Sequence, residues 1–337
     1  MDDFSAMESN FAVVGVGGRG SNLIHRLSMK GIKSADTIAV NTDAKHLNMI
    51  TSQKKLLIGK EITRGLGAGG FPEVAAKCAD ASNTEITEML SKYDLIFLAA
   101  GLGGGTGSGA GPAIARMAKE MGILVVSFVT YPFAIERSRM VKADWALEEF
   151  TKNSDTTIVI ENDKLLSYAP NLPMERSFEL IDDITINAVR GIADAIKIPS
   201  MINIDFADLK SVLSNRGAAI INIGSGSGVD KVEKAIKSTK THPLMNFDME
   251  GAKSALIHIS AGTALTIDEC NRVTEGVTEG LDPNANVILG ARLLPELEDQ
   301  IKVTSIITGV KPILGKQEYA YTGSVAAGVG NILDSIY

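Results

Sequence analysis

The chain alternates between short apolar runs and stretches in which apolar residues recur with helical spacing. Continuous apolar runs indicate buried strands, and recurrence every three or four residues indicates a helix. The predicted strands are 11–16, 36–40, 93–100, 124–130, 157–160, 218–224, 254–260, 285–293 and 301–308. The predicted helices are 21–29, 72–90, 112–121, 174–197, 230–238 and 266–280. The alternation of strands and helices predicts an α/β fold whose first part is a Rossmann-like parallel sheet.

The longest predicted helix, 174–197, divides the chain. It lies between Pro173 and Pro199 and carries an apolar face near the helical period. From residue 218 the pattern shifts to a second α/β domain, which we expect to have a mixed sheet. The expected organisation is an N-terminal tail 1–10, a first domain 11–173, the central helix 174–198, a loop and helix 199–217, a second domain 218–315 and a C-terminal tail 316–337.

Composition narrows the class of protein. The 337 residues suffice for two domains, and no apolar run reaches the roughly eighteen residues that a membrane span needs. A net charge of −7 argues against non-specific nucleic-acid binding. The first ten residues are acidic and polar and predict no signal peptide, while Cys78 and Cys270 lack metal-type spacing. These features indicate a reducing, cytoplasmic setting.

The segment Gly101–Gly111 carries the strongest chemical signal. It reads GLGGGTGSGAG, with seven glycines in eleven residues, between a predicted strand and a predicted helix. Glycines let backbone N–H groups approach a phosphate closely, and the start of a helix favours negative charge. Thr106 and Ser108 add hydroxyl donors. A flexible linker is the alternative, but linkers are not bracketed by core elements. We expect an anion-binding loop.

Two further glycine-rich segments point the same way. Gly15, Gly17 and Gly20 form G-x-G-x-x-G between a strand and a helix, a turn that also occurs in NAD- and FAD-binding proteins. Arg64–Gly70 reads RGLGAGG. Three such loops are more than one dinucleotide fingerprint explains. Asn22 follows the first loop and could bond a phosphate or ribose, or simply occupy the helix start.

Several polar residues near predicted strand ends have both a binding and a structural interpretation. Asn41–Asp43 could meet a sugar or phosphate, or form an Asx turn. Arg139, in a predicted loop with Glu136, could stabilise a terminal phosphate, or both could be solvated surface charges. On the long helix, Asp182 could accept N–H bonds from a guanine edge while Phe178 lies against the base. The alternative is a helix-start acid and a core Phe.

A pair of acids follows the long helix. Asp205 and Asp208 are three residues apart, so on a helical turn they face the same way, with Asn203 close by. Paired carboxylates can polarise a water or lie near a metal ion. The alternative for Asp205 or Asp208 is a helix cap.

In this order, these stretches resemble the FtsZ cell-division GTPase family, relatives of tubulin. The resemblance spans roughly residues 10–315, and its most specific part is GGGTGSG. The P-loop pattern G-x-x-x-x-G-K-[ST] is absent, consistent with the tubulin-like way of binding GTP. The other matching stretches are GVGGRGSN, NTDAKHL, GLGAGGFPEV, PFAIERSRM, ENDKLL, NIDFADLK and DPNANVILGARL.

The resemblance implies a site for GTP and GDP, with Mg²⁺ held by phosphates and water. It implies that Ala68, Gly69 and Gly70 approach the γ-phosphate, that Glu136 meets the ribose, and that Asn162 and Asp182 read guanine. It also implies that Asn203, Asp205 and Asp208 promote hydrolysis. The predicted nucleotide-binding set is Gly17, Gly18, Arg19, Asn22, Asp43, Ala68, Gly69, Gly70, Gly101, Gly103, Gly104, Gly105, Thr106, Gly107, Glu136, Arg139, Asn162, Phe178 and Asp182.

The sequence departs from the family at a few positions. Arg19 stands where the family usually has a small residue, which brings a cation near the phosphates, and Gly70-Phe71 replaces the commoner Ala-Asn. The segment 136–139 is one residue shorter than in many members, and the tail lacks the long linker and partner peptide of typical bacterial members.

Helix geometry suggests where hydrolysis occurs. Fifteen residues separate Asp182 from Lys197, about 22 Å along a helix, so one chain's acids would face the next subunit's nucleotide. Such a head-to-tail contact builds a filament. We therefore expect a self-associating GTPase at the division site, with division-site adaptor proteins as further partners. The alternatives are an NAD-dependent oxidoreductase and a nucleotide-binding regulatory homologue that does not cycle.

Overall fold

The computed structural model describes residues 9–164, 171, 173–214, 217–240 and 247–312. The predicted C-terminal tail 316–337 and most of the predicted N-terminal tail lie outside these residues. No helix in the described ranges is long and apolar enough to cross a membrane.

The N-terminal part is built on six parallel strands. They are β1 (Phe11–Val16), β2 (Asp36–Asn41), β3 (Lys54–Leu57), β4 (Leu95–Gly101), β5 (Leu124–Tyr131) and β6 (Thr156–Glu161), and their order in the sheet is β3-β2-β1-β4-β5-β6. The strands are parallel because helices connect them. This agrees with the predicted Rossmann-like parallel sheet, and the order in which successive strands are added reverses between β1 and β4.

Helices cover both faces of this sheet. Side chains of neighbouring strand residues point to opposite faces: Phe11 and Val13 join one apolar cluster, and Ala12 and Val14 join the other. The first face is covered by α1 (Gly17–Lys30) and α9 (Met174–Lys197). The second is covered mainly by α4 (Pro72–Ala81), α5 (Asn83–Leu90), α6 (Thr106–Glu120) and α7 (Arg137–Asn153). The short helices α2 (Ala44–Met49) and α3 (Lys60–Thr63) complete this part.

The C-terminal part has a mixed sheet. Strand β11 (Gln300–Thr308) pairs antiparallel with β7 (Gly217–Ser227) and with β9 (Ser254–Ala261), and β9 pairs parallel with β10 (Asn286–Leu293). The helices here are α10 (Phe206–Leu213), α11 (Lys231–Lys240), α12 (Ile267–Thr278) and the 3-10 turn η1 (Pro295–Leu297). A separate two-stranded pair joins β8 (Phe247–Asp248) to β12 (Lys311–Pro312).

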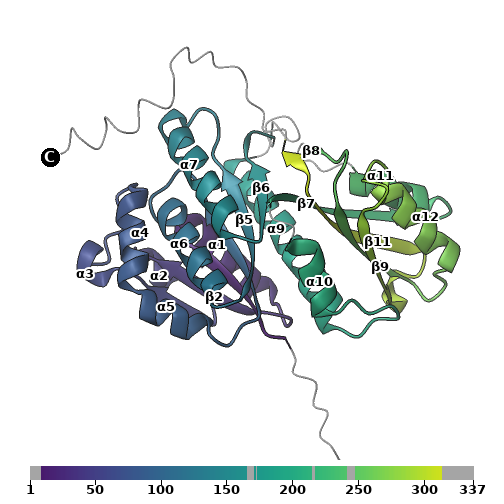
Figure 1. The fold of residues 1–337 in the computed structure, drawn as a ribbon, viewed down its shortest axis with the longest axis horizontal. Coiled ribbons are helices and arrows are strands. Elements are labelled where there is room, and N and C mark those ends of the chain that lie inside the picture. The colour runs from purple at the N-terminus through teal and green to yellow at the C-terminus, as the bar shows by residue number, and fades with distance from the viewer. Residues whose placement is uncertain (1–8, 165–170, 172, 215–216, 241–246, 313–337) are drawn as a thin grey trace, which may run out of the picture.

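The two parts are continuous. Strand β7 pairs with β6 through Thr156 and Thr157, so the strands form one ten-stranded sheet. Helix α9 lies between the two parts (Figure 1), and its apolar side chains share a core with both. The predicted fold class is confirmed, and the parallel and mixed parts of the sheet are joined where β6 pairs with β7.

Several predicted element boundaries were wrong. Helix α1 begins at Gly17 rather than 21, and α6 begins at Thr106 rather than 112, so glycines form their first turns. The predicted helix 72–90 is two helices that meet at Ser82. The loop predicted at 136–139 is instead the start of α7, with Glu136 at its N-cap position and Arg139 in its first turn. The strand β3 and the helices α2 and α3 were not predicted, because short elements carry little periodicity.

Candidate functional site

The predicted nucleotide-site residues gather at one edge of the parallel sheet. The segments that follow β1, β2, β4, β5 and β6 leave the carboxyl ends of these strands, and ligands of open α/β sheets bind at that edge where the chain reverses. Here the reversal falls between β1 and β4. The first turns of α1 and α6, which carry Gly17–Gly20 and Thr106–Gly109, therefore begin side by side.

The glycine loops are in contact with one another. A Cβ on Gly17 would lie 2.7 Å from the backbone nitrogen of Gly107, so the first and third loops meet. A Cβ on Gly105 would lie 3.0 Å from the nitrogen of Phe71 and 3.1 Å from that of Gly70, so the second loop joins them. The structure thus brings together three segments that are separate in sequence.

Gly18 and Gly104 are glycines for a different reason. A Cβ on either would meet no atom within 4 Å, and neither has the positive φ that favours glycine. Packing within the described chain therefore does not require glycine at either position. A ligand that approaches the backbone closely would require glycine, so the space beside these two residues suits the predicted phosphate contact.

The first turns of α1 and α6 suit an anion. No side chain caps either helix, which leaves N–H groups at each start for a ligand or water. The hydroxyls of Thr42 and Thr106 lie 2.8 Å apart and connect the end of β2 to the start of α6. Ser108 accepts a hydrogen bond from the N–H of Gly103 at 2.9 Å and so orders the loop itself.

Three polar residues near this edge have local structural partners. Asp43 caps α2, because its carboxylate accepts a hydrogen bond from the N–H of His46 at 2.9 Å. The amide oxygen of Asn22 lies 3.0 Å from Nε2 of His46, and the amide nitrogen of Asn41 lies 3.2 Å from Nδ1 of the same ring. The Asx turn expected for this segment is made by Asn41, whose Oδ1 accepts a hydrogen bond from the N–H of Asp43 at 3.3 Å, while Asp43 itself acts as a helix cap. His46 links the first loop to the end of β2.

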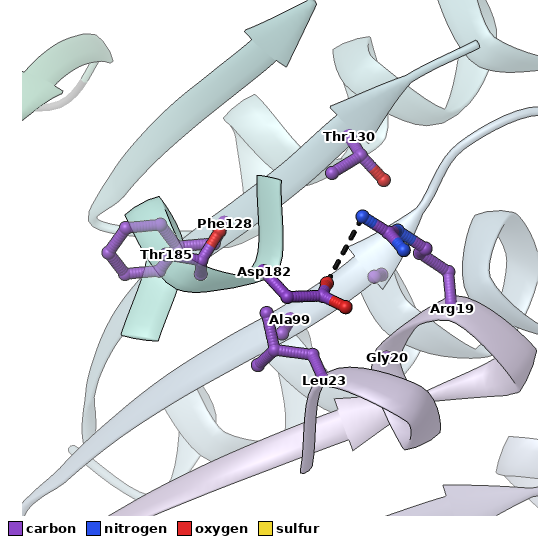
Figure 2. Close-up of a pocket in the computed structure, with 9 residues that line it drawn as sticks. Arg19, Gly20, Leu23, Ala99, Phe128, Thr130, Asp182 and Thr185 are labelled. Atoms are coloured by element: carbon purple, nitrogen blue, oxygen red, sulfur yellow. Dashed lines mark ion pairs between the residues drawn. The ribbon is translucent and has the colours of Figure 1, made fainter. Parts of the chain in front are cut away.

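Asp182 and Phe178 lie beside the first turn of α1. Asp182 is 1% exposed, and its Oδ1 and Oδ2 lie 3.1 Å from Nη2 of Arg19 and 3.0 Å from Nε of Arg26. Figure 2 shows the carboxylate of Asp182 facing the guanidinium of Arg19 in a narrow cavity that Thr130 and Leu23 also line. Burial raises the pKa of Asp182 to about 6, and the two arginines offset part of this effect.

Arg19 also covers the ring of Phe178. Its guanidinium carbon lies 4.9 Å from the ring centroid, and its Nη2 donates a hydrogen bond to the backbone oxygen of Phe178 at 3.3 Å. The ring of Phe133 meets Phe178 edge-on, with centroids 6.3 Å apart. Asp182 and Phe178, the predicted guanine-reading pair, therefore both contact Arg19, which the sequence analysis expected to lie near the phosphates.

The remaining nucleotide candidates lie at the ends of β5 and β6. Glu136 pairs with Arg139 at 2.7 Å, and a Cβ on Gly103 would lie 2.7 Å from Cβ of Arg139, so this helix start borders the third glycine loop. Asn162 is buried directly after β6, and its amide oxygen has no hydrogen-bond partner among the residues that the structure describes. Buried polar atoms are normally bonded, so this oxygen fits a ligand contact.

The acidic pair lies elsewhere and forms a capping box. The carboxylate of Asp205 accepts a hydrogen bond from the N–H of Asp208 at 2.7 Å, and that of Asp208 accepts one from the N–H of Asp205 at 3.2 Å. Asn203 accepts a hydrogen bond from the N–H of Ser200 at 2.7 Å. The capping alternative is therefore realised, yet Asp205 remains exposed and Asp208 half-buried.

Sequence reasoning missed several residues that organise this edge. Arg26 is the one that the sequence could most readily have indicated, because it lies seven positions after Arg19 and therefore on the same face of α1. Lys142 donates to the backbone oxygen of Gly70 at 2.7 Å, and the carboxylate of Asp163 accepts from the N–H of Ala134 at 3.0 Å. Neither of these contacts has a signal in sequence spacing.

Comparison with known proteins agrees with this arrangement. Residues 10–170 match the Tubulin/FtsZ family GTPase domain, and residues 217–311 match the FtsZ family C-terminal domain. Cell division protein FtsZ 2 of Methanocaldococcus jannaschii is 50% identical over 320 residues, covering 94% of this chain and 84% of that protein. Cell division protein FtsZ 1 of Thermococcus kodakarensis is 43% identical over 321 residues, covering 94% and 86%.

A solved structure has the same fold. An empty FtsZ dimer of M. jannaschii gives a TM-score of 0.83 at 40% identity, covering 91% of this chain and 93% of that one. These matches do not favour an NAD-dependent oxidoreductase. The chain therefore belongs to the FtsZ family, the cytoskeletal GTPases of cell division, and carries both the GTPase domain and the C-terminal domain of that family.

Proposed function

We propose that this protein binds GTP across the carboxyl edge of β1, β4, β5 and β6 and hydrolyses it at the junction between two subunits of a filament. The observation that carries the proposal is the separation of the glycine loops from the acids: the loops follow the carboxyl ends of the parallel strands, whereas the acids lie near the amino end of β1. Each of these two regions by itself holds half of a hydrolytic site.

The phosphates would lie over the three glycine loops. The backbone at Gly18 and Gly104 leaves room for them, and the starts of α1 and α6 supply N–H donors. The hydroxyls of Thr42 and Thr106 lie beside these loops. Mg²⁺, held by the phosphates and water, would neutralise charge on the transferring phosphoryl group when bound, and the N–H groups would orient that group for in-line attack.

The base would lie toward α9. Asp182 would accept the N–H groups of the guanine edge, Phe178 would lie against the ring, and the unpartnered amide oxygen of Asn162 would accept another base N–H. Glu136 and Arg139 would meet the ribose and the phosphate side from the start of α7. Ala68, Gly69 and Gly70 would approach the terminal phosphate.

The acids lie at the other end of α9. That helix has 24 residues, about 35 Å, and Nζ of Lys197 in its last turn lies 5.4 Å from the ring centroid of Phe11, the first residue of β1. The loop that follows is fixed to the C-terminal part, because Ile202 and Ala291 exchange backbone hydrogen bonds of 3.0 and 3.1 Å. Asp205 and Asp208 are thus held away from their own chain's glycine loops.

Exposed apolar side chains mark both ends. Leu66 and Ile135 are exposed beside the glycine loops, and Met201 and Ile202 are exposed beside the acids. Patches of this kind mark contacts with other molecules, and two different patches at opposite ends suit a head-to-tail contact that repeats into a filament. The relative from M. jannaschii is described as a dimer, which supports self-association of this chain. We place the filament in the cytoplasm at the division site, where adaptor proteins would bind it.

In the hydrolytic step, the carboxylates of Asp205 and Asp208 and the amide of Asn203 would orient the attacking water against the next subunit's γ-phosphate. An ionised carboxylate can accept a water proton and hold the oxygen in line with the bond that breaks. A GTPase rate that depends on assembly would follow, since each subunit carries the two halves at opposite ends and only a contact between subunits would bring them together.

A mixing experiment tests this division. Asp208→Ala keeps the glycine loops, and Gly104→Val keeps the acids but fills the phosphate surface. Each variant alone should hydrolyse GTP slowly. In an equimolar mixture about one interface in four pairs an intact loop set with intact acids, so we expect up to about a quarter of the wild-type rate. Pelleting of the two differently tagged variants confirms that they assemble together.

A mixture no more active than the sum of its components, despite co-assembly, would contradict the shared site. It would place the acids with their own chain's nucleotide. GTP binding and assembly by the wild type without phosphate release would instead support the non-cycling regulatory homologue.

A further inference from the structure

Arg19 makes contacts that the proposed base site would need for guanine. Its guanidinium lies 3.1 Å from the carboxylate of Asp182 and 4.9 Å from the ring centroid of Phe178. It also donates to the backbone oxygen of Phe178. One side chain thus covers both groups assigned to reading the base, and Figure 2 shows it reaching the carboxylate from the first turn of α1.

The chemistry of the guanidinium imitates that of guanine. Both groups are planar, both present adjacent N–H donors that suit a carboxylate, and both can lie against an aromatic face. A lysine ammonium shares the charge but has neither the planar fork nor the stacking surface. The arrangement is therefore specific to arginine rather than to any cation.

From this arrangement we propose that Arg19 is an internal ligand of the base site, which guanine displaces when GTP or GDP binds, and that this competition sets nucleotide affinity and exchange rate. This inference rests on the proposed function, since it takes Asp182 and Phe178 as the base-reading pair. It reverses the role suggested by the sequence, in which a cation at this position would strengthen phosphate binding.

The surroundings allow the exchange. Arg26 contacts the other oxygen of Asp182 at 3.0 Å, so the buried carboxylate keeps a counter-charge when Arg19 leaves. Arg19 retains 20% exposure, whereas Asp182 has 1%, so the arginine has a path to solvent and the acid does not. The stem of Arg19 passes over Gly101, where a Cβ would lie 2.7 Å from that of Arg19. Gly101 therefore leaves room for the stem of Arg19.

Substitution of Arg19 tests the competition. If the arginine occupies the base site in about nine molecules of ten, Arg19→Ala should bind GDP about tenfold more tightly and release it more slowly. Arg19→Lys should lie between the two. The matched control is Arg26→Ala, which removes a cation from the same carboxylate without uncovering Phe178 and should not tighten GDP binding. Isothermal titration gives the affinities, and chase of a ribose-labelled fluorescent GDP gives the release rates.

A probe without a base separates the two possible roles of the cation. Inorganic tripolyphosphate should bind Arg19→Ala no more tightly than wild type, since it does not need the base site. Weaker GDP binding by Arg19→Ala would show that Arg19 helps to bind the phosphates. Unchanged GDP binding would show that Arg19 does not affect the nucleotide. Either result overturns the inference. If wild type does not bind GDP, or if Asp182→Ala leaves its preference for GDP over ADP unchanged, the proposed function itself fails.

Discussion

The phenyl rings of Phe11 and Phe206 lie with their centroids 6.1 Å apart. Phe11 is the first residue of β1, and Phe206 directly follows Asp205. The glycine loop that begins at Gly17 follows the last residue of the same strand. The acids and the glycine loop are therefore separated by the length of β1, about 17 Å for its six residues, and the proposed mechanism assigns completion of the site to a neighbouring subunit.

Loss of an acid should abolish hydrolysis but not binding. Asp208→Ala removes a carboxylate remote from the glycine loops, so we expect GTP affinity to be unchanged within about twofold and phosphate release to fall by at least about a hundredfold. Filter binding and a phosphate-release assay check the two quantities.

The same substitution also weakens the cap of α10, at a cost of about 1 kcal/mol. Helix α12 offers a matched control, since Thr266 and Glu269 form an equivalent capping box. Because Glu269 also pairs with Lys231 at 2.9 Å, Glu269→Ala should destabilise the protein at least as much as Asp208→Ala, yet leave the GTPase rate of the filament unchanged. Equal loss of activity in both variants would attribute the effect to stability rather than to chemistry.

The GTPase rate per subunit should rise steeply with protein concentration. In the proposed mechanism a single chain presents the two halves of the site at opposite ends, so activity would require the interface. Phosphate release measured over a hundredfold concentration range, with light scattering in parallel, should show both signals rising together. A rate per subunit that stays constant over this range would be incompatible with a shared site.

Gly104 and Gly107, which lie in the same glycine-rich segment, should respond differently to substitution by alanine. A Cβ on Gly104 meets nothing within 4 Å, so Gly104→Ala should keep the unfolding free energy within about 0.5 kcal/mol while weakening GTP binding at least about tenfold. A Cβ on Gly107 would lie 2.4 Å from the backbone oxygen of Gly101, so Gly107→Ala should destabilise the fold by roughly 1–3 kcal/mol. Denaturant unfolding and titration with GTP distinguish them. Unchanged GTP affinity in Gly104→Ala would indicate that the phosphates do not bind at this loop.

The burial of Asp182 should make stability depend on pH. Its pKa in the fold is about 6, raised from 3.8 by burial, so folding favours the protonated form. The resulting stabilisation is fully present below about pH 4 and is lost as pH rises through about 6. The unfolding free energy of wild type relative to Asp182→Asn should therefore fall by about 3 kcal/mol between these values.

Urea unfolding at several pH values without nucleotide checks this dependence. A flat difference for Asp182→Asn would mean that Arg19 and Arg26 compensate the buried charge completely.

The sequence determined the parts of this protein whose signals are local. Apolar runs are enough to locate most of the strands, because a buried parallel strand must be apolar on both faces. The three glycine segments predicted backbone donors at strand ends, because glycine in such numbers has few other uses beside core elements. The predicted central helix agrees with α9, bounded by Pro173 and ending at Lys197. The family resemblance rested on these same segments.

Only the tertiary structure decided which side chains meet. Arg19 and Phe178 lie 159 positions apart, and no spacing rule joins them, so the sequence analysis placed Arg19 near phosphates whereas the fold turns it toward Phe178 and Asp182. The start of α7 at Arg137 was also invisible, because its charged first turn carries no apolar period. Local sequence patterns indicate secondary structure, because each residue contributes its own backbone preference. Contacts between side chains depend on how distant elements pack, and that is settled only when the whole core forms.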